Sequence, residues 1–300
     1  MTPTPTDLDV LIIGGGPAGL SAALCLGRAR KNVAVLDAGV PRHRVAEGVH
    51  NFISREGVAP AALREITWDQ MAAYPSVRHV GGRRIESLTW QRGRWVALDD
   101  HGEIWRGKAA LIATGVIDDH PDLPGYTARW GQSIHHCPYC HGWEVRDQPL
   151  AVLAQGEGAV HMGRLLRGWS DDVVVLTHGH DLEPEHAAAL EAAEIPVYTQ
   201  PIAALEGEAP ALSHVRFKDG TAVARQALFV VSGQRQVSLV TGLDLAQNEM
   251  GYVIVDEMMR TNAPMLWAAG DVTSRMQQVI ESAAQGLKAG AMINATLTLA

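Results

Sequence analysis

The sequence predicts an α/β fold built from two Rossmann-like, doubly wound domains. Two β-α-β patterns of similar layout indicate this class, one between Val10 and Asp37 and the other between Leu150 and Leu176. Each joins short apolar runs to a helical segment through a glycine-containing turn, as in parallel sheets flanked by helices. The 300 residues, 47% of them apolar, are enough for two cores of ordinary size.

The first pattern is followed by a turn-rich polar stretch, residues 41–57, which we expect to be a loop near a ligand. The strand that ends in Ala113-Thr114-Gly115 would then close this half of the fold. The elements expected here are strands over 10–13 and 33–36, a helix over 17–30, and strands over 90–96 and 107–113.

The second pattern begins after a Pro/Gly-rich stretch, Pro121–Gly125, which we take as the first hinge between domains. The second hinge is expected near Gly242. The elements expected in this half are strands over 150–153, 173–176, 228–231 and 266–269, a helix over 156–169, and a long Ala-rich helix from about Gln278.

Composition excludes several classes of function. The formal net charge of −8 gives no reason to expect a nucleic-acid partner. The opening segment MTPTPTDLD lacks a basic and apolar leader, and no apolar run approaches the roughly 18 residues of a membrane span. We therefore expect a cytoplasmic protein that does not cross a membrane.

The first glycine loop, Gly14-Gly-Gly16-Pro17-Ala18-Gly19, directly follows a strand and opens a helix. Its glycines allow the tight turn, the approach of a pyrophosphate and the packing of helix on strand. The helix N-terminus offers free N–H groups to phosphates, and Asp37 at the end of the next strand can bond ribose hydroxyls. This pattern predicts dinucleotide binding but does not separate FAD from NAD.

The cysteine pair Cys137-Pro-Tyr-Cys140 has the spacing of a redox-active or metal-binding motif. Two intervening residues let both sulfurs meet in one bond at the start of a helix, with Pro138 at its first position. A helix N-terminus and a nearby imidazolium would stabilise a thiolate, and His141 would exchange protons near neutral pH.

Three other interpretations of this pair stay open from the residues alone. A zinc site would recruit His135, His136 or His141, although no second Cys/His cluster completes it, and we predict no metal. A glutaredoxin-like domain also uses Cys-Pro-Tyr-Cys, but next to the first strand of a small domain. The pair could also be inert and structural, which is how we interpret the third cysteine, Cys25.

The second glycine loop is altered in either of two registers. Ala154-Gln-Gly156-Glu-Gly-Ala159 lacks the first glycine, and Gly156-Glu-Gly158-Ala-Val-His161 puts a bulky histidine where a small residue must pack. No arginine occurs between Arg167 and Arg216 to clamp a 2′-phosphate, and His178 and His180 are weak substitutes. Tight NADPH binding is therefore doubtful.

The chain resembles thioredoxin reductase and its relatives in four features taken in order. These are the Gly14–Gly19 loop, Ala113-Thr114-Gly115, the CxxC pair, and Ala269-Gly270-Asp271 followed by a Gln-containing helix. The resemblance implies that FAD is the cofactor, that Cys140 lies against it and that Cys137 exchanges with an external disulfide or dithiol. The catalytic residues expected are Cys137, Cys140 and His141. The cofactor-binding residues expected are Gly14, Gly16, Pro17, Ala18, Gly19, Asp37, Arg42, Asn51, Thr114, Gly115, Gly270, Asp271, Gln278 and Val279.

The resemblance also implies the domain organisation and the partners. Residues 1–118 and 243–300 would form a discontinuous FAD-binding domain, and residues 119–242 an inserted NAD(P)-binding-like domain with the CxxC pair. A homodimer is expected, with a small dithiol or disulfide, or a thioredoxin-like protein, as partner.

His141 after the second cysteine and Pro41-Arg42 after the ribose acid resemble a side branch of FAD-dependent dithiol oxidases of the gliotoxin and holomycin type. The first hypothesis is therefore a dithiol oxidase that passes electrons to oxygen. The second is a thioredoxin or disulfide reductase driven by NADPH or ferredoxin, and the third is a flavin-bound sensor without turnover.

Overall fold

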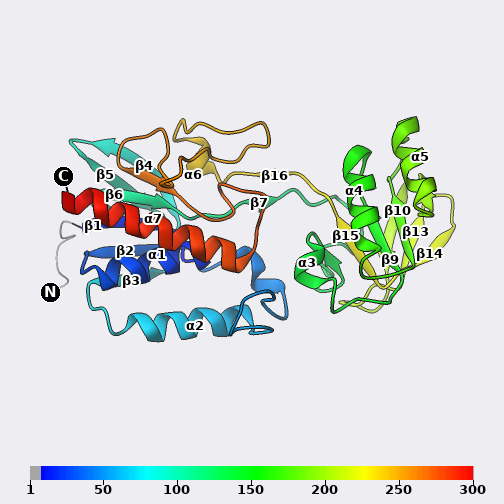
Figure 1. The fold of residues 1–300 in the computed structure, drawn as a ribbon, viewed down its shortest axis with the longest axis horizontal. Coiled ribbons are helices and arrows are strands. Elements are labelled where there is room, and N and C mark those ends of the chain that lie inside the picture. Colours follow the sequence, from blue (N-terminus) through cyan, green and yellow to red (C-terminus); the bar gives the residue numbers. More distant parts are fainter. Residues whose placement is uncertain (1–7, 300) are drawn as a thin grey trace.

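The computed structural model describes residues 8–299, so the opening residues 1–7 and Ala300 lie outside it. The chain forms an elongated molecule of two lobes joined by two extended segments (Figure 1). Each lobe is built on a parallel sheet, and this confirms the predicted α/β class with two Rossmann-like folds.

The first lobe holds a seven-stranded sheet in the order β3-β2-β1-β6-β5-β4, with β17 pairing β6. β1, β2, β3, β6 and β17 are parallel, whereas β4 and β5 continue the sheet antiparallel. Its strands are β1 (Leu8–Ile13), β2 (Val33–Asp37), β3 (Val77–Gly81), β4 (Ile85–Gln91), β5 (Arg94–Asp99), β6 (Ile104–Ile112) and β17 (Leu266–Ala268).

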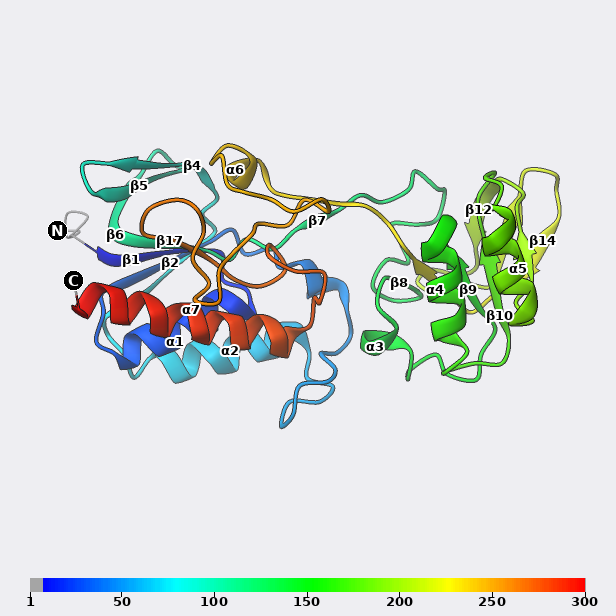
Figure 2. The same ribbon diagram turned by 45° about the horizontal axis from the view of Figure 1, so that its top comes forward.

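Different layers cover the two faces of this sheet (Figure 2). One face packs against α1 (Pro17–Arg28), α2 (Pro60–Met71) and α7 (Val279–Leu299). On the other face, side chains of β4 and β5, which form the antiparallel end of the sheet, share a core with the parallel strands and with the short helix α6 (Ser238–Thr241). α1 and α7 lie so close that a Cβ on Gly286 would stand 2.0 Å from the carbonyl oxygen of Ala18. The first half of α7 is therefore packed against the start of α1, where the first glycine loop lies.

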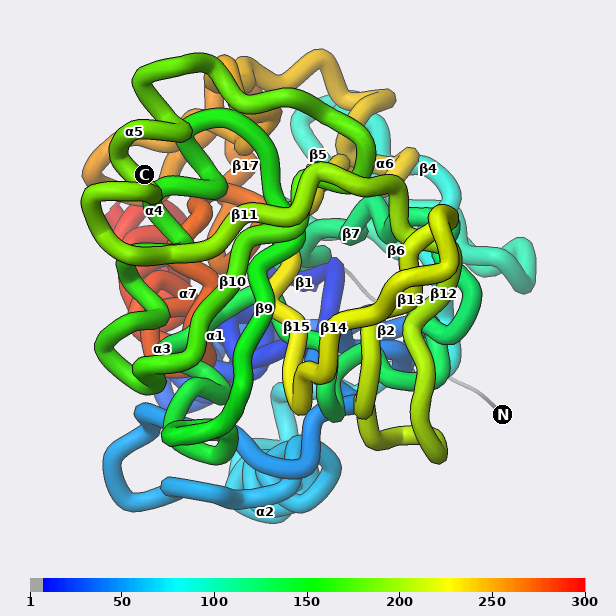
Figure 3. The backbone as a smooth tube through the Cα atoms, turned by 90° about the vertical axis from the view of Figure 1, so that its right-hand side faces the viewer, coloured from blue at the N-terminus to red at the C-terminus, as the bar shows by residue number. Residues whose placement is uncertain are grey.

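The second lobe repeats this plan on a five-stranded parallel sheet in the order β11-β10-β9-β15-β8. Figure 3 shows α4 and α5 on one side of it and the antiparallel strands β12, β13 and β14 on the other. Its elements are β8 (Ile134–His135), α3 (Pro138–His141), β9 (Leu150–Leu153), α4 (Gly156–Leu166), β10 (Val173–Leu176), α5 (Pro184–Ala192), β11 (Val197–Tyr198), β12 (Ile202–Glu206), β13 (His214–Phe217), β14 (Ala222–Ala224) and β15 (Ala227–Val230).

The two connections between the lobes pair with each other as β7 (Ile117–Asp118) and β16 (Gln234–Arg235). Leu239 and Val240 of α6 pack in the core of the first lobe, although the boundary expected at residue 243 puts them in the inserted domain. We therefore propose that the chain crosses back at β16, and that the first crossing lies at β7 as expected.

One predicted strand, over residues 90–96, is wrong. Arg92 and Gly93 both have positive φ, +50° and +77°, which bends the chain into a tight hairpin turn between β4 and β5. The polar stretch 41–57 also contains a short 3₁₀ helix, η1 (Arg42–Val45).

Candidate active site

The first glycine loop joins β1 to α1 in the conformation that its sequence predicts. Gly14 has φ +109°, and a Cβ there would lie 2.3 Å from the carbonyl oxygen of Ala113. A Cβ on Gly19 would lie 1.9 Å from the carbonyl oxygen of Gly14. Gly16 precedes α1, has no protein atom within 4 Å of its Cβ position, and lines a cavity. Two glycines therefore allow close packing, and the third leaves space for a ligand.

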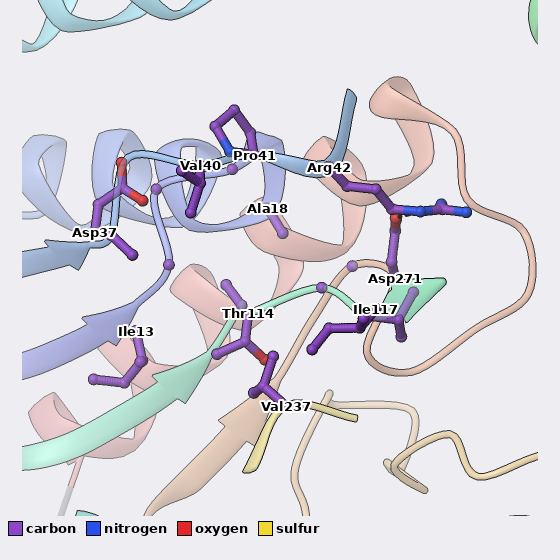
Figure 4. A pocket seen from close by; sticks show the side chains of 18 of the residues that line it. Ile13, Ala18, Asp37, Val40, Pro41, Arg42, Thr114, Ile117, Val237 and Asp271 are labelled. Atoms are coloured by element: carbon purple, nitrogen blue, oxygen red, sulfur yellow. Dashed lines mark hydrogen bonds and ion pairs between the residues drawn. The ribbon is translucent and has the colours of Figure 1, made fainter. Parts of the chain in front are cut away.

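That cavity has a volume of about 430 Å³ and lies at the carboxyl ends of β1, β2 and β6 (Figure 4). Gly19 does not line it, since it packs behind the loop. Thr114 lines it, and its Oγ1 is buried without a hydrogen-bond partner in the described chain. The expected residues that line the cavity are Gly14, Gly16, Pro17, Ala18, Asp37, Arg42, Thr114, Gly115, Gly270 and Asp271. A glycine cradle, an open helix N-terminus and an unpartnered hydroxyl fit a dinucleotide such as FAD.

Asp37 ends β2 at one side of the cavity and is held by a residue that the sequence did not reveal. Arg64 on α2 donates from Nη2 to Asp37 Oδ2 at 2.6 Å and from Nη1 to the carbonyl of Gly15 at 2.6 Å. Burial alone would raise the pKa of Asp37, but the hydrogen bonds from Arg64 and from the Gly39 N–H outweigh it and lower the pKa. Asp37 is therefore an ionised acceptor positioned for a sugar hydroxyl.

Arg42 lines the same cavity, but its guanidinium is engaged with protein groups. It donates to both oxygens of Asp118 at 2.6 Å, to Gln277 Oε1 at 2.7 Å and to Asp271 Oδ2 at 3.3 Å. Burial raises the pKa of Asp271 despite this contact, whereas the hydrogen bond from Arg42 lowers the pKa of Asp118 against the effect of its burial. Arg42 thus joins the loop after β2 to β7 and to the segment before α7.

A second cavity of about 120 Å³ continues from the first, since Pro17, Arg42, His43 and Asp271 line both. Cys140, His141, Gln278 and Val279 line only the second, and Cys137 is not among its lining residues. The first glycine loop and Cys140 therefore open into connected spaces, although residues 14–18 and Cys140 are far apart in sequence.

The cysteines lie at the start of α3, where Cys137 is the N-cap residue and Pro138 takes the first helical position. Both are free thiols. The side-chain amide of Gln278 donates from Nε2 to Cys137 Sγ at 3.3 Å and to Cys140 Sγ at 3.1 Å. One amide from the segment before α7 thus bonds both sulfurs of the second lobe.

The two thiols titrate as a pair. A hydrogen bond from the Cys140 thiol, together with the N–H groups of Cys140 and Tyr139, lowers the pKa of Cys137 against the effect of burial. The pKa of Cys140 is raised because its thiol donates that bond, because it is buried, and because a second negative charge would lie beside the first. At neutral pH the pair therefore favours one thiolate over two.

The expected imidazolium beside the cysteines is wrong. Burial and the neighbouring His50 lower the pKa of His141 to about 4, so its ring is neutral at pH 7. The His141 ring stacks on His135 at 4.3 Å between ring centres, and His50 meets it edge-on at 6.3 Å. Neither ring nitrogen of His135 or His141 has a hydrogen-bond partner within residues 8–299. In that range no group of three or more His, Cys, Asp or Glu side chains is placed to hold a metal ion.

Asn51 was expected at the flavin, but it lies on the surface and lines neither cavity. It has φ +59° and donates from Nδ2 to the carbonyl of Tyr139 at 2.5 Å. Gln132 makes a similar link by donating to the carbonyl of Val45 at 2.5 Å. These two bonds tie the loop after β2 to the cysteine-bearing segment.

The second glycine loop follows the register that lacks the first glycine. The N–H of Ala154 donates to the carbonyl of Leu176 at 3.2 Å, just as the N–H of Gly14 donates to the carbonyl of Leu36 at 2.9 Å. Ala154, Gly156 and Ala159 therefore stand where Gly14, Gly16 and Gly19 stand in the first lobe. His161 is exposed and does not take the packing position that the other register would give it.

The groups around this loop are unfavourable for phosphate. Glu157 puts a carboxylate in the first turn of α4, where a phosphate would need positive potential. His178 accepts a hydrogen bond from the N–H of Ile202 at 2.9 Å through Nδ1, and burial and Lys218 lower its pKa. Thr177, which stands where Asp37 stands in the first lobe, donates its hydroxyl to the carbonyl of His180.

Comparison with known proteins gives long matches. The family described as pyridine nucleotide-disulphide oxidoreductase matches residues 8–286. The thioredoxin reductase sirT of Leptosphaeria maculans is 31% identical, over 98% of this chain and 95% of that protein. The crystal structure of HlmI is 35% identical with a TM-score of 0.93, covering 98% of this chain and 94% of that one. The putative thioredoxin reductase TrxB of Bacillus anthracis is 34% identical with a TM-score of 0.93, covering 97% and 99%. Among the described helices, none is both long and apolar enough to span a bilayer.

We predict that Gly16→Val folds normally but retains less FAD than the wild type. The added side chain meets no protein atom and enters the space that a pyrophosphate would occupy. FAD content per protein after purification, with the circular dichroism spectrum as a check of folding, measures the effect. Gly158→Val in the first turn of α4 is the matched control, since its nearest neighbour is an ordinary 3.4 Å away. Equal FAD content in all three proteins would show that the cavity at Gly16 does not hold the cofactor.

Proposed function

This chain belongs to the pyridine nucleotide-disulphide oxidoreductase family, and on that premise we propose that it is an FAD-dependent dithiol oxidase that acts without tight NADPH binding. Within the family it is thioredoxin reductase-like, and the family implies FAD. The observation that carries the proposal is the position of the two sulfurs. Both lie within hydrogen-bond reach of Gln278, and Cys140 lines the cavity that continues from the glycine loop.

The cofactor residues are assigned as follows. Gly14, Gly16 and Gly19 shape the phosphate turn, and Ala18 in the first turn of α1 supplies an N–H to the phosphates, whereas Pro17 has no N–H and serves to begin the helix. Asp37, held by Arg64, accepts from the ribose. We propose that FAD also contacts other residues that line the two connected cavities. These are Arg42, Thr114, Gly115, Gly270, Asp271, Gln278 and Val279. Asn51 holds the loop against Tyr139.

The dithiol reaction follows from the two cysteines. Starting from the Cys137–Cys140 disulfide, a substrate thiolate attacks Cys137 Sγ, and the bond to Cys140 breaks with its electron pair on Cys140. The second substrate thiol then displaces Cys137, so that the substrate leaves as a disulfide having lost two electrons and two protons. Bound FAD supplies the two-electron acceptor that restores the cysteine disulfide, with oxygen as the final acceptor.

The assignment of the outer and inner sulfur rests on the cavity. Cys140 lines it, whereas Cys137 does not and has the lowered pKa, so that Cys137 is the better external nucleophile. Gln278 bonds both sulfurs and keeps them together when the disulfide is open. His141 lines the same cavity as Cys140, and its lowered pKa leaves the ring neutral at pH 7.

Residues around the second glycine loop support the proposal that the protein binds NADPH only weakly. Ala154 replaces the first glycine, Glu157 adds a negative charge, and no arginine lies between Arg167 and Arg216. Each lost charge-assisted hydrogen bond to a phosphate costs about 1.5–3 kcal/mol.

A disulfide reductase is the second candidate, because relatives across the full length of the chain are named thioredoxin reductases. It would use the same cysteines in the opposite direction, with ferredoxin or NADPH as donor and a thioredoxin-like protein as acceptor. A homodimer is proposed for either candidate.

We predict that a dithiol reduces the bound flavin and that NADPH does not. In anaerobic stopped-flow mixing, dithiothreitol should bleach the absorbance of oxidised flavin at about 450 nm. NADPH at the same concentration should bleach it at least about 100-fold more slowly, because the second lobe lacks a phosphate clamp. Rapid bleaching by NADPH would favour the reductase, and flavin that neither compound reduces would favour the sensor.

We also predict that the two cysteine variants differ in exchange with an external disulfide. Cys140→Ser leaves Cys137 free, so Ellman's reagent should give a stable mixed disulfide at Cys137, seen by mass spectrometry. Cys137→Ser leaves Cys140 as the thiol of the pair, which should react at least about tenfold more slowly because burial, which raises its pKa and lowers its thiolate fraction, persists without Cys137. Cys25→Ser serves as the control and should keep wild-type turnover. Equal labelling rates of the two variants would reverse or remove the assignment of outer and inner sulfur.

A further inference from the structure

His50 lies at the edge of the cysteine cavity, between that cavity and two exposed carboxylates. Its Nδ1 is 2.7 Å from Glu56 Oε1, and its Nε2 is 3.6 Å from Glu144 Oε1. The same ring meets His141 edge-on and lines the cavity with Cys140. The Glu56 side chain is 65% exposed. A single imidazole therefore has the buried cysteine on one side and carboxylates in water on the other.

The remaining histidines of the cavity are poor places for a proton to rest. Burial lowers the pKa of His43 and of His141 to about 4 and that of His136 to about 3, and it lowers that of His135 well below its usual value. The rings of His135 and His141 are hydrogen-bonded to no group in the described chain. A proton that leaves the Cys140 thiol needs an acceptor whose cation is stabilised. Of the five histidines that line the cavity, only His50 has a carboxylate oxygen within 4 Å among residues 8–299, and at His136 the effect of Asp118 does not offset burial.

We propose that His50 is the proton-relay residue of the cysteine pair, taking the proton of Cys140 across the shared cavity and passing it through Glu56 to solvent. This inference rests on the proposed function, because it concerns the protons that thiol–disulfide chemistry must move. The Glu56 carboxylate next to Nδ1 favours the tautomer of the His50 ring with its proton on Nδ1, which leaves Nε2 as the acceptor. Glu144 beside Nε2 then stabilises the imidazolium that forms.

The step is a proton transfer alone. The S–H bond of Cys140 breaks, its electron pair stays on sulfur, and by way of water in the shared cavity an N–H bond forms at Nε2 of His50. The Nδ1 proton moves to Glu56 and then to water. When the two thiols become a disulfide, two electrons go to FAD as the oxidant, and the relay carries the proton of Cys140.

The loop that contains His50, Asn51 and Glu56 holds the His50 ring in a fixed position relative to the cysteines. The second oxygen of Glu56 accepts the N–H of Asn51 at 2.8 Å, and the Asn51 side chain bonds the carbonyl of Tyr139 between the two cysteines. The left-handed φ of Asn51 lets one residue make both links. Asn51 and Glu56 are thus positioning residues. The titratable groups that face His50 or share its cavity are Glu56, Glu144, His141, His135, His136, His43, Arg42, Asp271 and Cys140.

The test uses the FAD-loaded protein with the variants His50→Ala and Glu56→Gln. The control is His101→Ala, because His101 is an exposed histidine of the first lobe, between β5 and β6, that lies beside Asp100. Anaerobic reduction of the flavin by dithiothreitol is followed together with proton release, read by an indicator dye in weakly buffered solution. His50→Ala should slow both signals at least about tenfold, as expected for loss of a general base. Added imidazole should restore both, and Glu56→Gln should slow proton release by a smaller factor. His101→Ala should match the wild type.

The pH profile of cysteine alkylation by iodoacetamide and the FAD content test for structural damage, and both should stay at wild-type values in His50→Ala. A His50→Ala protein within about twofold of wild type contradicts the relay, since a general base contributes far more. Slow reduction that imidazole does not restore, with normal alkylation, also contradicts it, because His50 then only shapes the pocket. If His50→Ala loses FAD, the Glu56→Gln variant is used to test the relay instead. Proton release from Glu56→Gln at the wild-type rate would then contradict the relay. A wild-type protein that does not react with dithiothreitol overturns the proposed function itself.

Discussion

The contact between the amide of Gln278 and the two sulfurs of Cys137 and Cys140 is the interaction on which the site depends. It joins the segment before α7, in the first lobe, to α3 in the second, at distances of 3.3 and 3.1 Å. The bonds from Asn51 to Tyr139 and from Gln132 to Val45 hold the same two surfaces together. Because three separate segments make these bonds, the sulfurs stay beside the cavity that runs back to the first glycine loop.

The two lobes use one architectural plan for different purposes. Each has a parallel sheet with helices on one face and antiparallel strands on the other, and each has a strand–turn–helix unit at the same place. In the first lobe, Gly14 allows the backbone to pack against Ala113, Gly16 leaves space for a ligand, and Asp37 is an ionised acceptor. In the second, Ala154 stands in place of the first glycine and Glu157 puts a carboxylate in the first turn of α4. This difference agrees with chemistry that passes from dithiol to flavin.

The sequence predicted those parts of the site that local chemistry determines. Positive φ and close packing demand glycine at Gly14 and Gly19, so the first loop could be recognised without its surroundings. Contacts between distant segments gave no such signal: Arg64 holds Asp37 from another helix, and Glu144 meets His50 from the other lobe. The pKa of His141 also depends on burial, which spacing does not reveal. The strand expected over 90–96 was wrong because its turn uses Arg92, a residue that rarely takes positive φ.

The number of electrons that the protein takes up tests most directly whether the sulfur pair and the flavin form one redox unit. Air-oxidised protein would be titrated anaerobically with dithionite while its flavin absorbance and free thiols are counted. The account predicts an uptake of about four electrons per FAD, two for the flavin and two for the Cys137–Cys140 disulfide. The double variant Cys137→Ser, Cys140→Ser should take up about two. An uptake of about two in the wild type, with no new thiols, would contradict electron exchange between the cysteines and FAD.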